Sequence, residues 1–243
     1  ERKIAHLTTQ PQKVMMAAVL AGAYLTMIGL VYWTIQQQFA PNPLGKFLGA
    51  MFFGTGLAII VFTKAELFTG NHLFMTLSTL SGKNSVKHGV YLWLLCWSGN
   101  LIGAILVAWL LSNANIFTGW SEAHALFVGA HHKMAMPASE IFFKGILANW
   151  IVCFALWVNL QLREELARFV AILLIIFIFV YLGLEHSIAN MGTLAMACFA
   201  DSHLPLAPMF SNLLWSSLGN IVGGCLGAGL PFWYLYRPSP EEG

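Results

Sequence analysis

The chain has 243 residues, of which 58% are hydrophobic and only 9% are charged, and its formal net charge is +2. Soluble domains carry about 25% charged residues, so this composition excludes an ordinary soluble protein and indicates contact with lipid. The small net charge, without a stripe of basic and aromatic residues, argues against a nucleic-acid partner. The four cysteines lie within apolar segments, where we expect small buried side chains and neither disulfides nor metal ligands.

Six apolar segments are predicted to span a membrane as helices, so residues 1–243 form a single all-α polytopic membrane domain. These segments are residues 14–36, 45–80, 88–112, 138–160, 168–200 and 207–235. The first, third, fourth and sixth are close to the ~20 residues that cross a bilayer. The second and fifth are longer and contain charged residues, so we expect helices 2 and 5 to be broken.

Two pairs of matched motifs indicate a duplication. Glu66–Asn71 and Glu185–Asn190 both have the form Glu, four residues, Asn, at an offset of 119 residues. The motifs Gly99–Ala104 and Gly219–Gly224 both begin Gly-Asn and are offset by 120 residues. Small residues four apart let helices approach closely, and Asn100 and Asn220 can hydrogen-bond across such a contact.

The duplication divides the chain into repeat halves 14–112 and 138–236, joined by a loop over 113–137. Each half has three spans, an odd number, so the second half must insert upside down relative to the first. Such an inverted 3+3 repeat relates its halves by a pseudo-twofold axis in the membrane plane. It brings the two interrupted segments together near the middle of the membrane.

The distribution of basic residues predicts the orientation of the chain. Eight lie on one side and only Lys46 and Lys133 on the other, which places both termini in the cytoplasm by the positive-inside rule. The eight are Arg2, Lys3, Lys13, Lys83, Lys87, Arg163, Arg168 and Arg237.

The two interruptions are the candidate functional site. Unwound backbone cannot face lipid, so it must pack against protein or line a wet cavity, where free helix N-terminal amides suit an anion. His186 can change charge near neutral pH, and an ionisable group inside a membrane is a functional candidate. The alternative interpretation is a neutral structural histidine that bonds Thr69 or backbone.

Charged side chains within the spans need partners. We expect Glu185 to pair with Lys144, which offsets the cost of burying either charge, either as a purely structural ion pair or beside a vestibule into which Lys144 draws anions. Lys64, two residues before Glu66, has no clear role. His131 and His132 are expected in a solvated loop, because two histidines without a third ligand are a weak metal signal.

Taken together, these motifs resemble the formate/nitrite transporter family. The similarity covers about residues 14–236 and is strongest in Lys144–Trp150, Glu66–Asn71, Gly183–Met191 and the two Gly-Asn motifs. It implies a homopentamer of aquaporin-like protomers in the cytoplasmic (inner) membrane, each with its own pore and no cofactor. The implied substrates are small monovalent weak-acid anions: formate, nitrite and, in some members, lactate, acetate or hydrosulfide.

The resemblance also implies roles for individual residues. His186 would be the central histidine and Thr69 its hydrogen-bonding partner, with Asn149 and Lys144 near the pore. The apolar constrictions would be formed by Leu57, Phe68 and Phe179, with Phe53 nearby. Position 64, a lysine here, usually holds a small residue in the family.

The mechanism that we hypothesise is transport of a neutral acid. Helix-terminal amides and Lys144 attract the anion, desolvation raises its pKa, and it takes a proton from His186 or from a water that His186 orders. Partners of the protein are thus a small anion, a proton and membrane lipid. A passive anion channel with a protonated His186 is the alternative within this class.

Three other classes fit the sequence less well. An aquaporin-type channel for neutral solutes would carry Asn-Pro-Ala motifs, but the only Asn-Pro here, Asn42-Pro43, lies in a predicted loop. An intramembrane enzyme would need a motif such as His-Glu-x-x-His or Gly-x-Ser-x-Gly, and neither occurs. A scaffold without transport would not need two charged interruptions.

Overall fold

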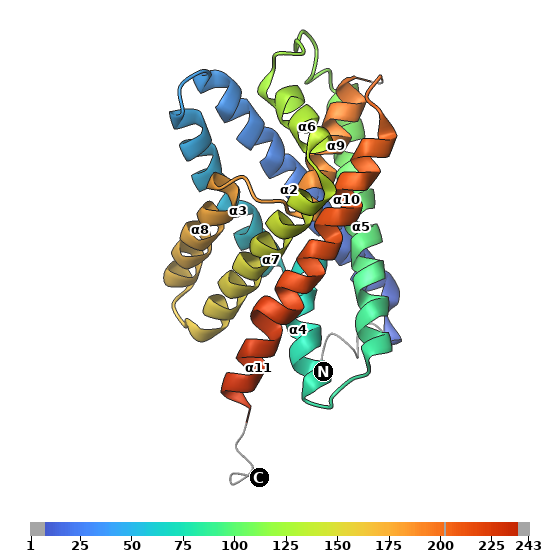
Figure 1. Ribbon diagram of the computed structural model, residues 1–243, viewed down its shortest axis with the longest axis vertical. Helices are drawn as coiled ribbons and strands as arrows, with labels where there is room; N and C mark the ends of the chain where they lie inside the picture. Colours follow the sequence, from blue (N-terminus) through green and yellow to red (C-terminus); the bar gives the residue numbers. More distant parts are fainter. Residues whose placement is uncertain (1–7, 202, 238–243) are drawn as a thin grey trace.

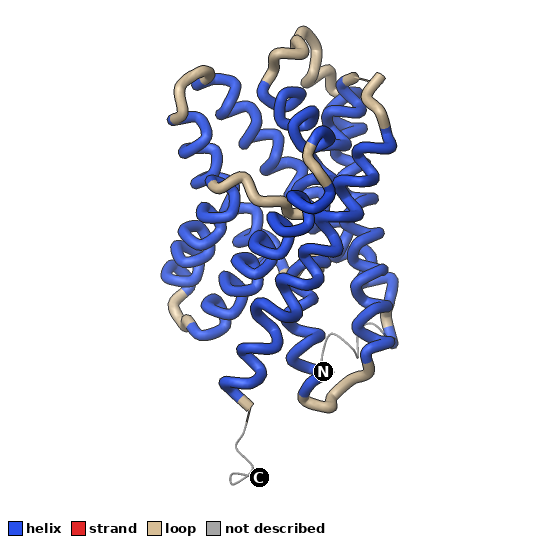
Figure 2. Tube along the Cα trace, in the orientation of Figure 1, coloured by secondary structure: helices blue, strands red, loops and turns tan. Residues whose placement is uncertain are grey.

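The computed structural model describes residues 8–201 and 203–237, and in this part of the chain helices are joined by loops (Figures 1 and 2). The helices are α2 (Pro11–Phe39), α3 (Leu44–Thr63), α4 (Phe68–Leu80), α5 (Val86–Asn113), α6 (Ala125–Ala135), α7 (Ala138–Gln161), α8 (Glu165–Tyr181), α9 (Ser187–Ala200), α10 (Leu206–Val222), the π-helix η1 (Gly223–Gly229) and α11 (Leu230–Tyr236). Within the described residues, five helical segments are long and apolar enough to cross a membrane: α2, α3, α5, α7 and the continuous run over 206–236. The expected all-helical membrane protein is therefore confirmed.

The second and fifth predicted segments each contain two helices. Residues 64–67 separate α3 from α4, and residues 182–186 separate α8 from α9. Figure 2 shows the second of these connections crossing the middle of the molecule, whereas most other loops lie at its ends. The helices α8 and α9 have 17 and 14 residues, so each alone is short for a bilayer crossing.

Backbone geometry explains where α3 ends. Lys64 adopts the left-handed conformation, with φ 59° and ψ 30°, and its N–H bonds back to the last turn. Gly183 adopts φ 66° in the corresponding turn after α8. Glycine takes this conformation freely, whereas a residue with a Cβ is strained there by roughly 1–2 kcal/mol.

The glycines of the Gly-Asn motifs sit where helices touch, as the sequence predicts. A Cβ at Gly103 would lie 2.0 Å from the carbonyl oxygen of Val19, so α5 packs directly on the backbone of α2. A Cβ at Gly223 would lie 2.0 Å from the carbonyl oxygen of Ile146, at the contact of η1 with α7. Both contacts exclude any side chain larger than hydrogen.

The segment 113–137 is not simply a loop, because it contains α6. His124 caps this helix: its Nδ1 accepts a hydrogen bond from the N–H of Leu126 at 3.2 Å, and its ring stacks on Trp120. Burial lowers the pKa of His124, which favours the neutral ring that the cap requires. His131 and His132 lie on α6, which also carries Lys133. The sequence gives little warning of this helix, since 113–137 is short of apolar periodicity.

The close contact of α2 with α5 predicts the effect of one methyl group. We expect Gly103→Ala to lower the free energy of unfolding by about 1–3 kcal/mol, because its Cβ would overlap backbone that cannot move alone. Gly89→Ala on the same helix is the matched control, since its Cβ would meet Met75 at an ordinary 3.7 Å. Thermal unfolding in detergent measures both, and equal midpoints for the two variants would contradict the expectation.

Candidate functional site

Asn100 satisfies the exposed backbone at the start of α4. Its Oδ1 accepts a hydrogen bond from the N–H of Phe68 at 3.0 Å. Its Nδ2 donates to the carbonyl oxygens of Ala18, at 2.7 Å, and Glu66, at 3.0 Å. One buried side chain thus joins α5, α2 and both sides of the first interruption.

Asn220 does the same at the start of α9. Its Oδ1 accepts from the N–H of Ser187 at 2.9 Å, and its Nδ2 donates to the carbonyl oxygens of Gly145, at 2.8 Å, and Glu185, at 3.0 Å. The predicted cross-helix role of the two asparagines is confirmed. The expectation of free terminal amides does not hold for the first amide of each helix, because the N–H groups of Phe68 and Ser187 donate to these side chains.

In each of the two Glu–Asn motifs, the asparagine side chain donates a hydrogen bond to the glutamate carboxylate of the same motif. Asn71 Nδ2 donates to Glu66 Oε2 at 2.9 Å, and Asn190 Nδ2 donates to Glu185 Oε2 at 2.6 Å. The spacing places the amide one turn into the following helix, within reach of the carboxylate before it.

Glu185 pairs with Lys133. The sequence had suggested Lys144 as its partner, and that prediction is wrong. Lys133 Nζ on α6 lies 2.7 Å from Glu185 Oε1, and the Glu185 side chain is only 2% exposed. Asn212 donates a further bond to the same carboxylate at 3.1 Å. Lys144 instead pairs with Glu140, one turn earlier on α7, where both side chains are partly exposed.

His186 connects the two interruptions. As the N-cap of α9, it accepts the Ala189 N–H at Nδ1, at 3.2 Å. Only an unprotonated nitrogen can accept, so the ring proton belongs on Nε2, which lies 2.9 Å from Thr69 Oγ1. This geometry assigns a neutral imidazole that donates to the Thr69 hydroxyl.

A small central cavity lies against this ring. It has a volume of about 10 Å³, close to the minimum that one water occupies. Its lining is Leu25, Phe53, Leu57, Leu67, Val152, Ile176, Phe179 and His186. The imidazole is the one polar side chain among these eight, and a stable buried water needs two to four polar partners. The cavity is therefore a dry constriction.

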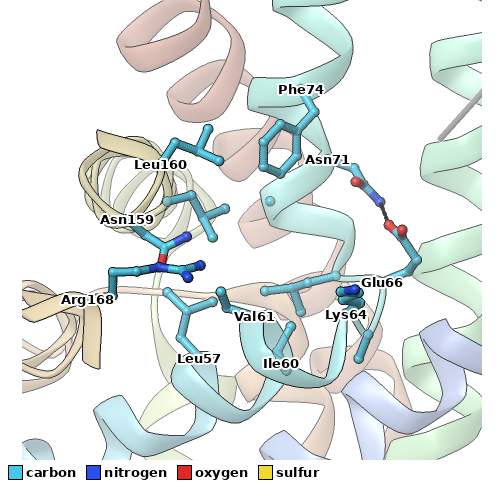
Figure 3. A pocket seen from close by; sticks show the side chains of 14 residues that line it. Leu57, Ile60, Val61, Lys64, Glu66, Asn71, Phe74, Asn159, Leu160 and Arg168 are labelled. Atoms are coloured by element: carbon cyan, nitrogen blue, oxygen red, sulfur yellow. Dashed lines mark hydrogen bonds between the residues drawn. The ribbon is translucent and has the colours of Figure 1, made fainter. Parts of the chain in front are cut away.

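Two larger cavities flank the constriction. The first, which we call the α4-side cavity, has a volume of about 250 Å³ and shares Leu57 and Leu67 with the central cavity. The second, the α6-side cavity, has about 300 Å³ and shares Phe53, Phe179 and His186 with it. Leu160 lines the first and Lys144 the second, about 24 Å apart along α7 at 1.5 Å per residue. The three cavities thus form a series through the protein, and Figure 3 shows the first.

The predicted site residues divide into four groups, the last of which is Phe68 alone. Leu57, Phe53, Phe179 and His186 line the constriction, whereas Lys144 and Glu185 line the α6-side cavity. Thr69 and Asn149 are fully buried behind the wall. Phe68 was expected to form a constriction, but it lines none of the three cavities. Its ring instead packs edge-on against His72 at 4.4 Å.

Asn149 supports the wall behind the constriction. Its Nδ2 lies 3.2 Å from the carbonyl oxygen of Thr69, 2.6 Å from that of Asn220 and 2.8 Å from His72 Nδ1. It therefore links the first turn of α4 to α10. A Cβ at Gly224 would lie 2.5 Å from Asn149 Nδ2, so the glycine of the π-helix makes room for this amide.

Sequence reasoning missed Lys133 and Asn212 as partners of Glu185, and Asn159 as the partner of Arg168. Arg168 Nε donates to Asn159 Oδ1 at 2.9 Å, at the α4-side cavity. Asn159 and Asn212 did offer a signal, since each is a polar residue within a predicted span. Lys133 offered none, because its segment resembled a solvated loop.

Comparisons with known proteins agree with this geometry. The model of the family described as Formate/nitrite transporter matches residues 1–234. The nitrite transporter NirC of Salmonella typhimurium is 34% identical over 254 residues, covering 99% of this chain and 91% of the relative.

Two solved structures are similar over nearly the whole fold. An FNT family ion channel has a TM-score of 0.90 at 32% identity, covering 97% of this chain and 95% of its own. A pentameric formate channel with formate bound has a TM-score of 0.78 at 26% identity, covering 93% and 98%. The architecture, the matched motifs and these similarities lead to one conclusion: the chain belongs to the formate/nitrite transporter family, whose members are membrane transporters and channels rather than enzymes.

Proposed function

We propose that this protein transports small monovalent weak-acid anions, formate or nitrite above all, across the inner membrane together with a proton. The observation that carries the proposal is the series of cavities that meet at a dry constriction beside His186. The names of the related nitrite transporter and formate channel support this choice of substrates. Lactate and acetate are further candidates, because they share a monovalent carboxylate.

We infer further that the two halves, 14–112 and 138–236, form an inverted repeat within one domain, with α3–α4 and α8–α9 as broken helices. Six of the eight residues around the central cavity support this, since they form three matched pairs. Leu57 matches Ile176 and Leu67 matches His186 at the 119-residue offset; Leu25 matches Val152 at the offset of 127 that relates the first spans. An axis between the halves would pass through the constriction, as in an aquaporin-like protomer.

The proposed permeation path follows from the cost of moving charge. The wide cavities admit a hydrated anion, and Lys144 on the α6-side wall favours its entry. A bare anion between Leu57, Phe53 and Phe179 would lose its hydration without replacement, whereas the neutral acid is far cheaper to move. Loss of water raises the pKa of the substrate itself, so protonation accompanies entry into the constriction.

The hydrogen bonds of His186 constrain its role in this path. A neutral ring with its proton on Nε2 cannot give that proton away without becoming an imidazolate. His186 therefore acts as a proton donor only after it takes a proton at Nδ1, at the expense of its bond from Ala189. We propose this cycle: a proton from water in a flanking cavity binds Nδ1, and the same proton then passes to the substrate anion. The ring is left neutral, with Nε2 held by Thr69 at 2.9 Å throughout.

For the assembly, we propose a homopentamer in which each protomer has its own pore. The related pentameric formate channel supports this state. We also propose that both termini are cytoplasmic. The turn between α4 and α5, which carries Lys83, and the connection from α7 to α8, which carries Arg163, lie toward the same end of the molecule in Figure 1, and α11 also ends there.

A transport assay tests the proposed function. In proteoliposomes, an imposed proton gradient should drive accumulation of radiolabelled formate and nitrite, with matching acidification of the lumen. Nitrate, the anion of a strong acid, should not accumulate, because it cannot be protonated. Flux of all three anions that follows membrane potential without a pH change would instead establish a passive anion channel.

Replacing His186 separates proton transfer from permeation. In His186→Asn the amide oxygen can still accept the Ala189 N–H as an N-cap, so the start of α9 should remain in place. We expect this variant to lose gradient-driven accumulation while it still lets anions pass. Parallel recordings of formate flux and lumenal pH measure the two effects, and undiminished coupling would show that the proton comes from water.

Lys133 and Lys144, two of the three lysines that line the α6-side cavity, should differ in their structural importance. Lys133→Met would leave the buried Glu185 carboxylate without its cation, and we expect a loss of about 3 kcal/mol in unfolding free energy. Lys144→Met breaks a partly exposed pair, worth less than about 1 kcal/mol. Thermal unfolding in detergent compares the two variants. The double variant Lys133→Met/Glu185→Gln should regain part of the loss, and failure to do so would contradict a charge-based effect.

A further inference from the structure

The α4-side cavity carries two cationic side chains to which the mechanism above gives no role. Lys64 and Arg168 both line it. Figure 3 shows them reaching the cavity from opposite sides, Lys64 from the end of α3 and Arg168 from the start of α8. Two cations that converge on one cavity from different elements are an arrangement that attracts an anion.

Both groups have hydrogen-bonding capacity left for a ligand. Arg168 is held through Nε by Asn159 Oδ1, which fixes the guanidinium and leaves its two terminal amino groups. For Lys64 Nζ, no hydrogen bond or ion pair is found among residues 8–201 and 203–237. The carboxylate on this wall, Glu66, accepts a bond from Asn71 at 2.9 Å. The cavity thus has two cationic groups against one carboxylate.

The backbone at Lys64 gives an independent reason to look for a role for its charge. Its left-handed conformation would be free of strain for glycine, and Gly183 holds the matching position in the second half. Keeping a lysine there costs backbone strain. Its side chain is exposed.

We propose that Lys64 and Arg168 form an anion-binding subsite in the α4-side cavity. It holds one hydrated carboxylate or nitrite ion just before the ion reaches Leu57 and Leu67. Two oxygens of such an anion match the terminal amino groups of a guanidinium, and the ammonium supplies a second, mobile charge. The inference rests on the proposed function, because it assigns this cavity to the same substrate.

The test is Lys64→Gly, which removes the charge and relieves the backbone strain, so the fold should be kept. Initial rates of formate entry are measured in right-side-out and inside-out vesicles, which present the two cavities in turn. We expect the KM for entry from the α4 side to rise about threefold to tenfold, with no change in KM from the α6 side. The wild-type KM should rise with ionic strength, and the dependence should be much weaker in the variant.

Two further variants make the result specific. Lys64→Arg keeps the cation and should keep the low KM. Lys87→Gln removes a charge at the start of α5, outside the three cavities, and should behave as wild type. An unchanged KM in Lys64→Gly, or an equal rise in Lys87→Gln, would overturn the subsite. Absence of formate and nitrite flux in the wild-type protein would overturn the proposed function instead.

Discussion

The arrangement of the site depends on the hydrogen bonds of two buried asparagines. Where a helix stops inside a membrane, lipid offers no partner for the backbone groups that it leaves, and each unpaired group costs several kcal/mol. Asn100 and Asn220 each accept one backbone N–H and donate to two backbone carbonyl oxygens. These backbone groups belong to the interrupted segment and to a neighbouring span. Because these bonds fix the starts of α4 and α9, they also fix Thr69 and His186 at hydrogen-bonding distance from each other.

The hydrogen bonds of the two asparagines are nearly the same in both halves, but side chains at several matching positions differ in charge and polarity. Leu67 and His186 hold matching positions and both line the central cavity, one apolar and one able to carry a proton. Lys64 and Gly183 also match, one charged and one not. In the inverted repeat that we propose, matched positions form the constriction, and the positions that differ distinguish the two ends of the proposed pathway.

Much of this could be predicted from the sequence, because matched motifs mark both interruptions. The matched Glu–Asn motifs located both, and the Gly-Asn motifs predicted the close helix contacts. The sequence did not predict which charged side chains pair in three dimensions. Lys144 seemed the natural partner for Glu185 because it lies in a span, but α6 brings Lys133 to the carboxylate from a segment that was expected to be a loop. Phe68, which the resemblance places at a constriction, packs edge-on against His72, a contact that only the packing of α4 reveals.

The size of the central cavity links this scaffold to selectivity. A space of about 10 Å³ with one polar side chain cannot replace the water around an anion. The imidazole of His186, which lines this cavity, already has a partner at each nitrogen. Its Nδ1 accepts the Ala189 N–H, and its Nε2 lies against the Thr69 hydroxyl. In the transport that we propose, a permeating species therefore sheds its charge, and His186 gives up a bond to supply the proton. This route favours substrates that are anions in the wide cavities and acids in the narrow one, so that in this proposal the acidity of the substrate, more than its size, decides what passes.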